Sequence, residues 1–158
     1  MPKIDLQNVP VRTGSGYPAP YDKAMTGRSS LRLGDAAGLT QFGVNLVRLD
    51  PGALSSLRHW HENEDEFVMV TEGALTLIDD TGETPLVGGD CVAFPAGDAN
   101  GHHIVNRSAA PGAFLVVGSR ARKETGHYSD VDMIVTVENG AARYTRRDGS
   151  AIDPGIGQ

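Results

Sequence analysis

The stretch from Gly52 to Gly73, which reads GALSSLRHWHENEDEFVMVTEG, places the strongest constraint on this chain. Leu57 before the two histidines and Phe67–Val70 after them are apolar and β-favouring. Strand residues two apart point to the same face. We therefore expect His59 and His61 to share one face while Trp60 faces the other. Glu66 opens an apolar run, and the short acidic turn before it can bring its carboxylate back beside the imidazoles. Two imidazoles and one carboxylate inside a β structure suit a divalent transition metal with open coordination positions.

Simpler interpretations of the same residues exist. A histidine near a strand end is commonly a solvated or hydrogen-bonded side chain, and the motif is short. Glu62, Glu64 and Asp65 are typical of a solvated turn. A zinc-binding HExxH helix is excluded, because the residue four places after His61 is Asp65. Support for a metal site must come from elsewhere in the chain.

Composition indicates one turn-rich, all-β domain. The 158 residues are enough to bury a core, and 39% hydrophobic with 22% charged residues is typical of globular proteins. The 20 glycines and 9 prolines indicate many turns. A net charge of −6 argues against nucleic acid and anionic membranes as partners, because both call for basic surfaces.

Cysteine usage and the first residues predict a cytoplasmic protein. Cys91 is the single cysteine, so no internal disulfide and no cysteine-paired zinc site can form. We expect it to be a small buried hydrophobic residue. The start MPKIDL lacks the pattern of a signal peptide, and no apolar run approaches the roughly 18 residues needed to span a bilayer.

The order of turn residues predicts a barrel with two additions. Residues 1–38 are interrupted by proline and glycine, which leaves no room for a long helix and little for paired strands, so they predict an arm laid over a core. Gly14 and Gly16 lack the remaining residues of a nucleotide-binding loop. Between residues 39 and 120, short strands alternate with Gly, Pro and Asp turns, which favours a β-sandwich or barrel. The expected strands are 42–49, 67–70, 74–78, 91–94, 103–105 and 113–118.

Residues 121–158 predict a C-terminal extension. A polar segment, 123–130, is followed by an apolar strand at 133–137. Asn139 and Gly140 both tolerate positive φ and predict a two-residue hairpin turn, with 142–145 as the returning strand. The end from Asp148 to Gln158 is expected to fray.

Two spaced patterns in the sequence resemble the signatures of the cupin superfamily, G(X)5HXH(X)3–4E(X)6G and G(X)5PXG(X)2H(X)3N. The first is carried by Gly52, His59, His61, Glu66 and Gly73, and the second by Gly89, Pro95, Gly97, His102 and Asn106. Six residues instead of five precede His59, and four instead of two precede His102. Both additions fall in loops, where extra residues cost little closure entropy. The chain is most similar in kind to small, single-domain bacterial type-2 cupins.

This resemblance implies an all-β, double-stranded β-helix, the jelly-roll barrel of cupins, with a metal inside its wider end. It implies that His59, His61, Glu66 and His102 bind one divalent ion, which leaves about two of six positions open. His103 remains an alternative to His102, although the three-residue gap to Asn106 favours His102. Fe2+, Mn2+, Ni2+ and Zn2+ all accept this ligand set. Metal affinity is expected to fall as the pH drops through about 6.5, where an ordinary histidine is protonated.

Two classes of function are compatible with these residues. One is a metal-dependent enzyme of the dioxygenase, isomerase or lyase type that acts on a small metabolite. The other is a non-catalytic sensor or binding module for a small ligand, because one scaffold hosts many chemistries. Val68 and Val70 are expected to form an apolar wall beside Glu66, with ordinary core favoured over substrate contact. His127 and Tyr128 can reach the pocket mouth from the C-terminal segment, but packing or surface positions are favoured. An apolar outer β face, together with the resemblance, predicts a homodimer.

Overall fold

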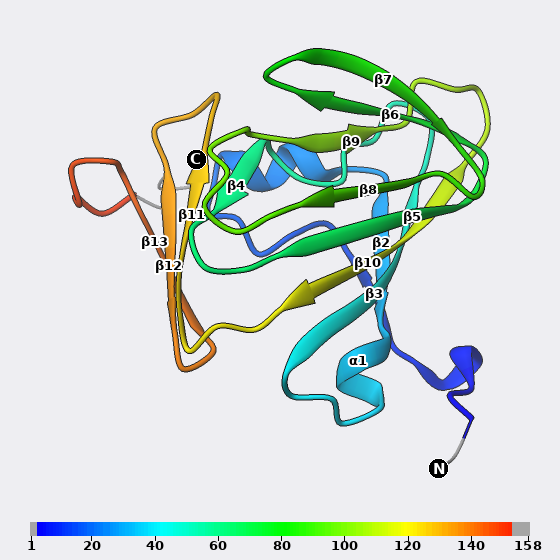
Figure 1. Cartoon of the computed structure of the whole chain (residues 1–158), viewed down its shortest axis with the longest axis horizontal. Coiled ribbons are helices and arrows are strands. Elements are labelled where there is room, and N and C mark those ends of the chain that lie inside the picture. Colours follow the sequence, from blue (N-terminus) through cyan, green and yellow to red (C-terminus); the bar gives the residue numbers. More distant parts are fainter. Residues whose placement is uncertain (1–2, 153–158) are drawn as a thin grey trace.

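The chain folds into three antiparallel sheets that surround one interior (Figure 1). The computed structural model describes residues 3–152. Sheet A has the strand order β1-β2-β3-β10-β5-β8, sheet B the order β7-β6-β9, and sheet C the order β13-β12-β11-β4. These are the bounds in sheet A: β1 Val11–Thr13, β2 Arg28–Arg32, β3 Phe42–Leu49, β10 Gly112–Ser119, β5 Glu66–Glu72 and β8 Cys91–Phe94. Sheet B contains β7 Gly82–Val87, β6 Ala74–Asp79 and β9 His103–Val105. Sheet C contains β13 Ala141–Thr145, β12 Ile134–Glu138, β11 Lys123–Tyr128 and β4 His59–His61.

Helices are short in the described part of the chain. They are the 3-10 turns η1 Leu6–Asn8 and η2 Tyr21–Met25 and the α-helical turn α1 Leu33–Ala36. None of the helices among residues 3–152 has the length and apolar character that crossing a membrane requires.

The core lies between sheets A and B, as a β-sandwich or barrel requires. Sheet A contributes buried residues such as Val47, Leu49 and Phe114, and sheet B contributes Leu77 and Ile104. The sequence prediction of an all-β, double-stranded β-helix is confirmed by these antiparallel sheets. A second cluster, which includes Met133, joins sheet C to the N-terminal arm.

Alternation along the strands of sheet A separates an inner from an outer face. In β5, Glu66 and Val68 line the interior cavity, so the predicted apolar wall is confirmed at Val68, whereas Val70 is buried in the core and does not line the cavity. Phe67 and Met69 point to the outer face, where 43% and 39% of their surface is exposed. Cys91 lies next to Met69 on this outer face and is exposed, so the prediction that it is buried was wrong.

The arm is part of sheet A, which the sequence did not predict. β2 pairs with β3 over five residues, from Arg28 opposite Leu49 to Arg32 opposite Asn45, and β1 pairs with β2. The expectation that this region offers little room for paired strands was therefore wrong. The inward positions of β2 are Arg28, Ser30 and Arg32, which line a polar cavity, so the strand lacks the apolar alternation by which strands are recognised.

The C-terminal hairpin is confirmed and extends sheet C. β12 and β13 pair from Ile134 opposite Thr145 to Glu138 opposite Ala141. Asn139 has φ of 51° and Gly140 has φ of 82°, as a two-residue hairpin turn requires. Part of the end that was expected to fray is ordered, because Thr145 forms a bridge with Ala151; residues 153–158 lie outside the described part.

Strands β7 and β11 were missed. Pro85 interrupts the β propensity of β7, although it sits in an edge strand, where a missing amide donor is tolerated. β11 reads KETGHY, and its buried positions are Glu124, Gly126 and Tyr128. A strand whose buried face carries a carboxylate and a glycine gives no hydrophobic signal in the sequence.

Candidate metal centre

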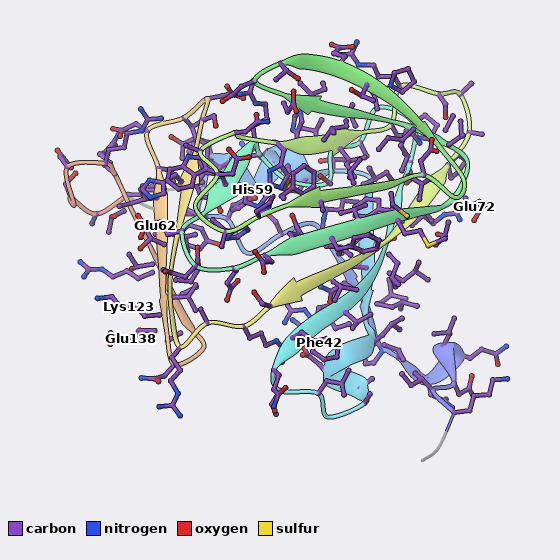
Figure 2. The ribbon with its side chains drawn as sticks, viewed as in Figure 1. Phe42, His59, Glu62, Glu72, Lys123 and Glu138 are labelled. Atoms are coloured by element: carbon purple, nitrogen blue, oxygen red, sulfur yellow. The ribbon has the colours of Figure 1, made fainter. Side chains whose placement is uncertain are left out.

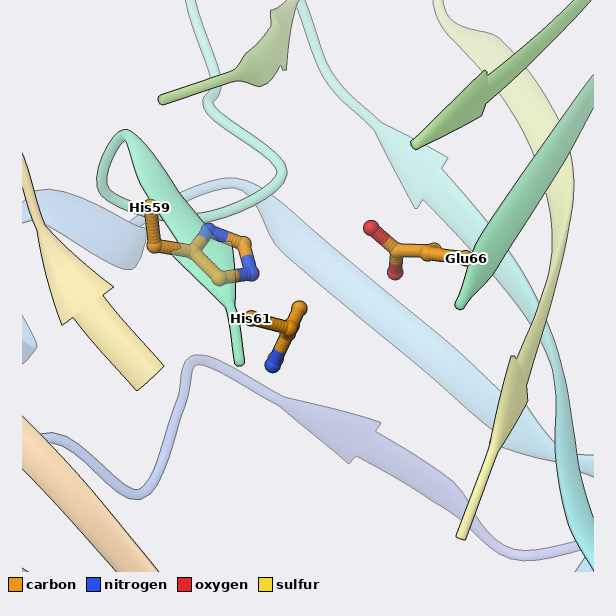
Figure 3. A group of neighbouring side chains, drawn as sticks. All are labelled: His59, His61 and Glu66. Atoms are coloured by element: carbon orange, nitrogen blue, oxygen red, sulfur yellow. The ribbon is translucent and has the colours of Figure 1, made fainter. Parts of the chain in front are cut away.

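His59, His61 and Glu66 meet inside the barrel (Figure 3). One ligand atom from each lies within 4.8 Å of the others, and all three side chains are partly buried. The two imidazole centroids are 4.9 Å apart, so the histidines share one face as predicted. Trp60 faces away and stacks on His127, with 4.3 Å between ring centroids. Figure 2 shows His59 within the interior of the fold, whereas Glu72, at the far end of β5, lies at the periphery.

The backbone fixes the orientation of His59. Its Nδ1 lies 2.9 Å from the carbonyl oxygen of Leu57, which is a hydrogen-bond acceptor, so Nδ1 carries the proton and donates. This tautomer leaves the lone pair of Nε2 for a metal. The ring also stacks on Tyr128 of β11, with centroids 5.8 Å apart.

A carboxylate from β11 stands behind His61. Nδ1 of His61 is buried and lies 3.3 Å from Oε1 of Glu124, although the contact lacks the angles of a hydrogen bond. Glu124 is itself only 2% exposed and accepts the backbone amides of Glu62 and Asn63 at 2.9 and 2.8 Å. Gly126 stands opposite His61 in the sheet, where a Cβ would come within 2.9 Å of Val135. A carboxylate behind a ligating imidazole holds its ring and raises its basicity.

His102 lies beside this group. Its Nε2 hydrogen-bonds to Oε2 of Glu66 at 3.0 Å, and its ring stacks parallel to Phe94 with 3.4 Å between centroids. The Nδ1 of His102 lies 3.4 Å from the carbonyl oxygen of Asn100, which could accept the ring proton from Nδ1 if a metal took the place of the proton that Nε2 donates to Glu66. His103 instead directs Nδ1 to the carbonyl oxygen of Ser56 at 3.0 Å. The assignment of His102 as fourth ligand stays a prediction.

Burial and mutual contacts set the charges of these groups. Burial lowers the pKa of His59 to about 4, against the opposing attraction of Glu66. Burial alone would raise the pKa of Glu66, but the hydrogen bond from His102 and the nearby imidazoles lower it below its usual value. At neutral pH, His59 is therefore uncharged and Glu66 ionised, which are the forms that bind a metal. His59 keeps that form well below the pH of about 6.5 expected for an ordinary histidine.

The group opens onto a cavity of about 750 Å³. Its lining includes Tyr128, for which the sequence favoured a packing or surface position over the pocket mouth, and Glu64, which the sequence placed in a solvated turn. Oε1 of Glu64 accepts the backbone amide of Ala121 at 2.8 Å, and burial raises the pKa of its carboxyl group. Only the alternation of acidic residues before Glu66 could have pointed to an inward Glu64.

The donor set fits a divalent metal. It combines an ionised carboxylate with two imidazoles. Nδ1 of His59 donates to a backbone carbonyl oxygen, and Nδ1 of His61 lies beside the carboxylate of Glu124, so Nε2 of each ring is the nitrogen left for a metal. It also borders open space that a small molecule can enter. Three of the four predicted ligands are thus brought together around one point, and the fourth is hydrogen-bonded to one of them.

Comparison with known proteins agrees with this architecture. The family described as the cupin domain matches residues 45–118. A crystal structure of a sugar phosphate isomerase from the cupin superfamily of Silicibacter pomeroyi is 63% identical, covers 96% of each chain and superposes with a TM-score of 0.93. This chain belongs to the cupin superfamily.

Two further structures are similar to this cupin. A protein from Acidithiobacillus ferrooxidans, named as a candidate sugar phosphate isomerase, is 30% identical over 79% of this chain and 80% of its own, with a TM-score of 0.71. The polyketide cyclase RemF of Streptomyces resistomycificus is 20% identical over 75% of this chain and 79% of its own, with a TM-score of 0.62, and shows the fold alone. No curated protein sequence matches the chain.

Segments outside the matched cupin domain complete its site. Glu124 and Tyr128 come from β11, and part of the cavity wall comes from β1 and β2 of the arm. In this cupin the residues of the two cupin signatures supply the donor atoms, while the segments outside the matched domain orient them and enclose the space around them.

Replacing Glu124 with glutamine is expected to weaken metal binding about 10- to 100-fold, because the carboxylate behind His61 is lost while the side-chain shape is kept. Competition titration with a chromophoric chelator would measure the affinity, and the spectrum of Co2+ loaded into the protein would report the ligand geometry. Glu83→Gln, at an exposed ion pair in β7, is the matched control. Equal affinity in the two variants would show that Glu124 only packs.

Proposed function

We propose that this cupin is a metal-dependent enzyme that isomerises a small hydroxy-carbonyl compound, with sugar phosphates as the substrate class. The observation that carries the proposal is the cluster of His59, His61 and Glu66 opening onto a cavity large enough for a small metabolite. The name of the Silicibacter pomeroyi relative supports the reaction class, since the two chains are 63% identical along nearly their whole length.

Different residues of the cavity would bind the metal and surround the substrate. His59, His61 and Glu66, with His102 as fourth ligand, would hold one divalent ion of the Fe2+, Mn2+, Ni2+ or Zn2+ type. When bound, the ion supplies Lewis-acid polarisation of a substrate carbonyl. Phe94 and Val68 border the same cavity and restrict water around the reacting carbons.

Isomerisation also needs a group that moves a proton between neighbouring carbon atoms. Glu64 lines the cavity, lies outside the ligand cluster and has one oxygen fixed by the amide of Ala121. Its second oxygen is the protein atom that we assign to this proton transfer.

Metal binding can be tested on protein purified without a histidine tag. Elemental analysis is expected to find about one divalent ion per chain in the natural protein and to identify it. A His59→Ala/His61→Ala double variant should lose it, because two of the clustered donors are gone. Retention of equal metal in the double variant would contradict the metal centre. The His127→Ala variant is the control, since that imidazole stacks on Trp60 outside the cluster.

The reaction can be tested with a panel of aldose and ketose phosphates in D2O. NMR should show interconversion with deuterium entering the carbon next to the carbonyl group. Glu64→Gln is expected to lower kcat by about 10²- to 10⁴-fold without changing the metal content. Glu62→Gln is the control: the carboxylate of Glu62 pairs with His127, so its replacement should leave kcat unchanged. Oxygen consumption instead would indicate a dioxygenase, and cleavage products a lyase. Tight binding without turnover would indicate the alternative, a non-catalytic ligand-binding cupin.

We also propose a homodimer formed through the outer face of sheet A. One register row on this face is apolar across all six strands: Val11, Leu31, Leu46, Leu115, Met69 and Cys91. Val11 is 67% exposed, so the row is open to solvent in the single chain. A second copy offers the same surface, and most soluble oligomers are symmetric in this way.

Met69→Glu is expected to convert the dimer to a monomer, because it places a charge in the apolar row between Leu115 and Cys91. Light scattering coupled to size-exclusion chromatography measures the mass. Val87→Glu, at an exposed apolar residue of sheet B, is the control and should leave the mass unchanged. A natural protein that elutes as a monomer would overturn the assignment.

We propose a cytoplasmic location, since the single thiol of Cys91 is exposed and stays reduced only in a reducing compartment. Cell fractionation with immunodetection tests this, and recovery in an extracytoplasmic fraction would contradict it.

A further inference from the structure

Three arginines of the N-terminal arm form one wall of the cavity. In β2, Arg28 lies two residues before Ser30 and Arg32 two residues after it, so the side chains of Arg28, Ser30 and Arg32 point to the same face. Arg12 of β1 stands opposite Ser30 in the register, which makes it a diagonal neighbour of both other arginines. Arg12, Arg28 and Arg32 all line the cavity that holds the ligand cluster. We call these three residues the arginine wall.

Carboxylates do not balance the charge of this wall. Asp35 is shared by Arg32, at 3.7 Å, and by Arg120, which hydrogen-bonds to it. Among residues 3–152, Arg12 and Arg28 form no ion pair with a carboxylate. The excess of positive charge stands out in a chain whose net charge is −6.

Arg28 is fixed by the backbone but keeps donors for a ligand. Its Nε donates to the carbonyl oxygen of Ser55 at 2.7 Å, and its Nη1 donates to that of Gly14 at 2.9 Å. Its Nη2 makes no hydrogen bond within the described part of the chain. Burial lowers the pKa of Arg28, which shows that the cation is partly removed from water. A guanidinium held in this way presents a preset fork for a tetrahedral anion.

The arginine wall and the cluster of His59, His61 and Glu66 line the same cavity, at a distance that one small molecule can span. β2 and β5, which carries Glu66, are three strand spacings apart in sheet A, or about 14 Å along an unbent sheet. Long arginine side chains and the curvature of the barrel shorten the gap. A molecule of a few carbon atoms can thus place its charged end at the wall and its carbonyl group at the cluster.

We propose that Arg12, Arg28 and Arg32 form a phosphate subsite that binds the phosphate group of a small phosphorylated sugar and sets its position relative to the metal centre. The proposal rests on the proposed function for the role of the sugar, but the subsite is testable without turnover. It assigns to the arm, which lies outside the matched cupin domain, the selection of substrate by its phosphate group.

The test measures binding of inorganic phosphate, glucose 6-phosphate and glucose to metal-free protein by calorimetry at pH 8. The natural protein should bind both phosphates and not glucose. Arg12→Gln should weaken phosphate binding about tenfold, the loss expected for one charge-assisted hydrogen bond. Arg12 makes no side-chain hydrogen bond in the described structure, so its replacement should leave folding intact. Arg48→Gln is the matched control, because Arg48 lies in the same sheet on the opposite face and pairs with Glu72.

A second variant examines the fork geometry. Arg28→Lys keeps the charge but loses the paired donors, and it should weaken phosphate binding at least as much as Arg12→Gln. If this variant fails to fold, because Arg28 also holds Ser55 and Gly14, the Arg12 variant decides. Equal phosphate affinity in Arg12→Gln and Arg48→Gln would overturn the subsite.

The same titrations distinguish free phosphate from a phosphorylated sugar as the ligand. Together with the activity assay, they also test the phosphate subsite separately from the proposed isomerase reaction. Glucose 6-phosphate binding more tightly than inorganic phosphate supports a phosphorylated sugar as ligand, and inorganic phosphate binding more tightly overturns that part. Phosphate binding that depends on Arg12 in a protein without isomerase activity would uphold the subsite and reject the proposed reaction. Isomerase activity in a protein whose phosphate binding ignores Arg12 would do the reverse.

Discussion

The two-residue alternation of sheet A is the constraint on which the site depends. Every strand of this sheet contributes to one inner face, because the register keeps inward residues opposite inward residues from β1 to β8, apart from a shift between Ala113 and Phe114 where β10 pairs with the end of β5. That face is graded: arginines on β1 and β2, apolar residues such as Val47 and Phe114 in the middle, and Glu66 on β5. A shift of one residue in any strand would turn its inward set to solvent. The barrel is therefore also the device that places cationic, apolar and metal-binding groups in a single cavity.

Polar groups in this cavity have partners supplied both by neighbouring residues and by distant parts of the chain. Leu57 fixes His59 through a carbonyl oxygen, Glu124 stands behind His61, and His102 donates to Glu66. Removing such groups from water costs free energy unless hydrogen bonds or opposite charges replace the lost solvation. In the arginine wall, Arg12 and Arg28 form no ion pair with a carboxylate among residues 3–152, which is the basis for proposing an anionic ligand there.

The arm and the C-terminal extension both contribute residues to the candidate site of this cupin. The matched domain, residues 45–118, contains the ligand cluster, but the carboxylate behind His61 and the arginines opposite come from outside it. Sheet C joins both sides, because β4 carries His59 and His61 and pairs with β11 of the extension. The segments on either side of the matched domain thus place further residues around the candidate metal centre.

The sequence by itself determined the all-β class, the strands that carry alternating apolar residues, the hairpin at Asn139 and Gly140, and the convergence of His59, His61 and Glu66. These features are local or carried by spacing, since strand parity and turn chemistry act over a few residues. Only the tertiary structure decided that the arm forms strands, that Cys91 is exposed, and that Glu124 and the arginine wall face the cavity. The arm, Glu124 and the arginine wall depend on which surface a polar strand packs against, and the exposure of Cys91 depends on whether the outer face of sheet A is covered. Polar strands that face a polar cavity leave no hydrophobic period in the sequence, so their partners become visible only when the sheets have closed.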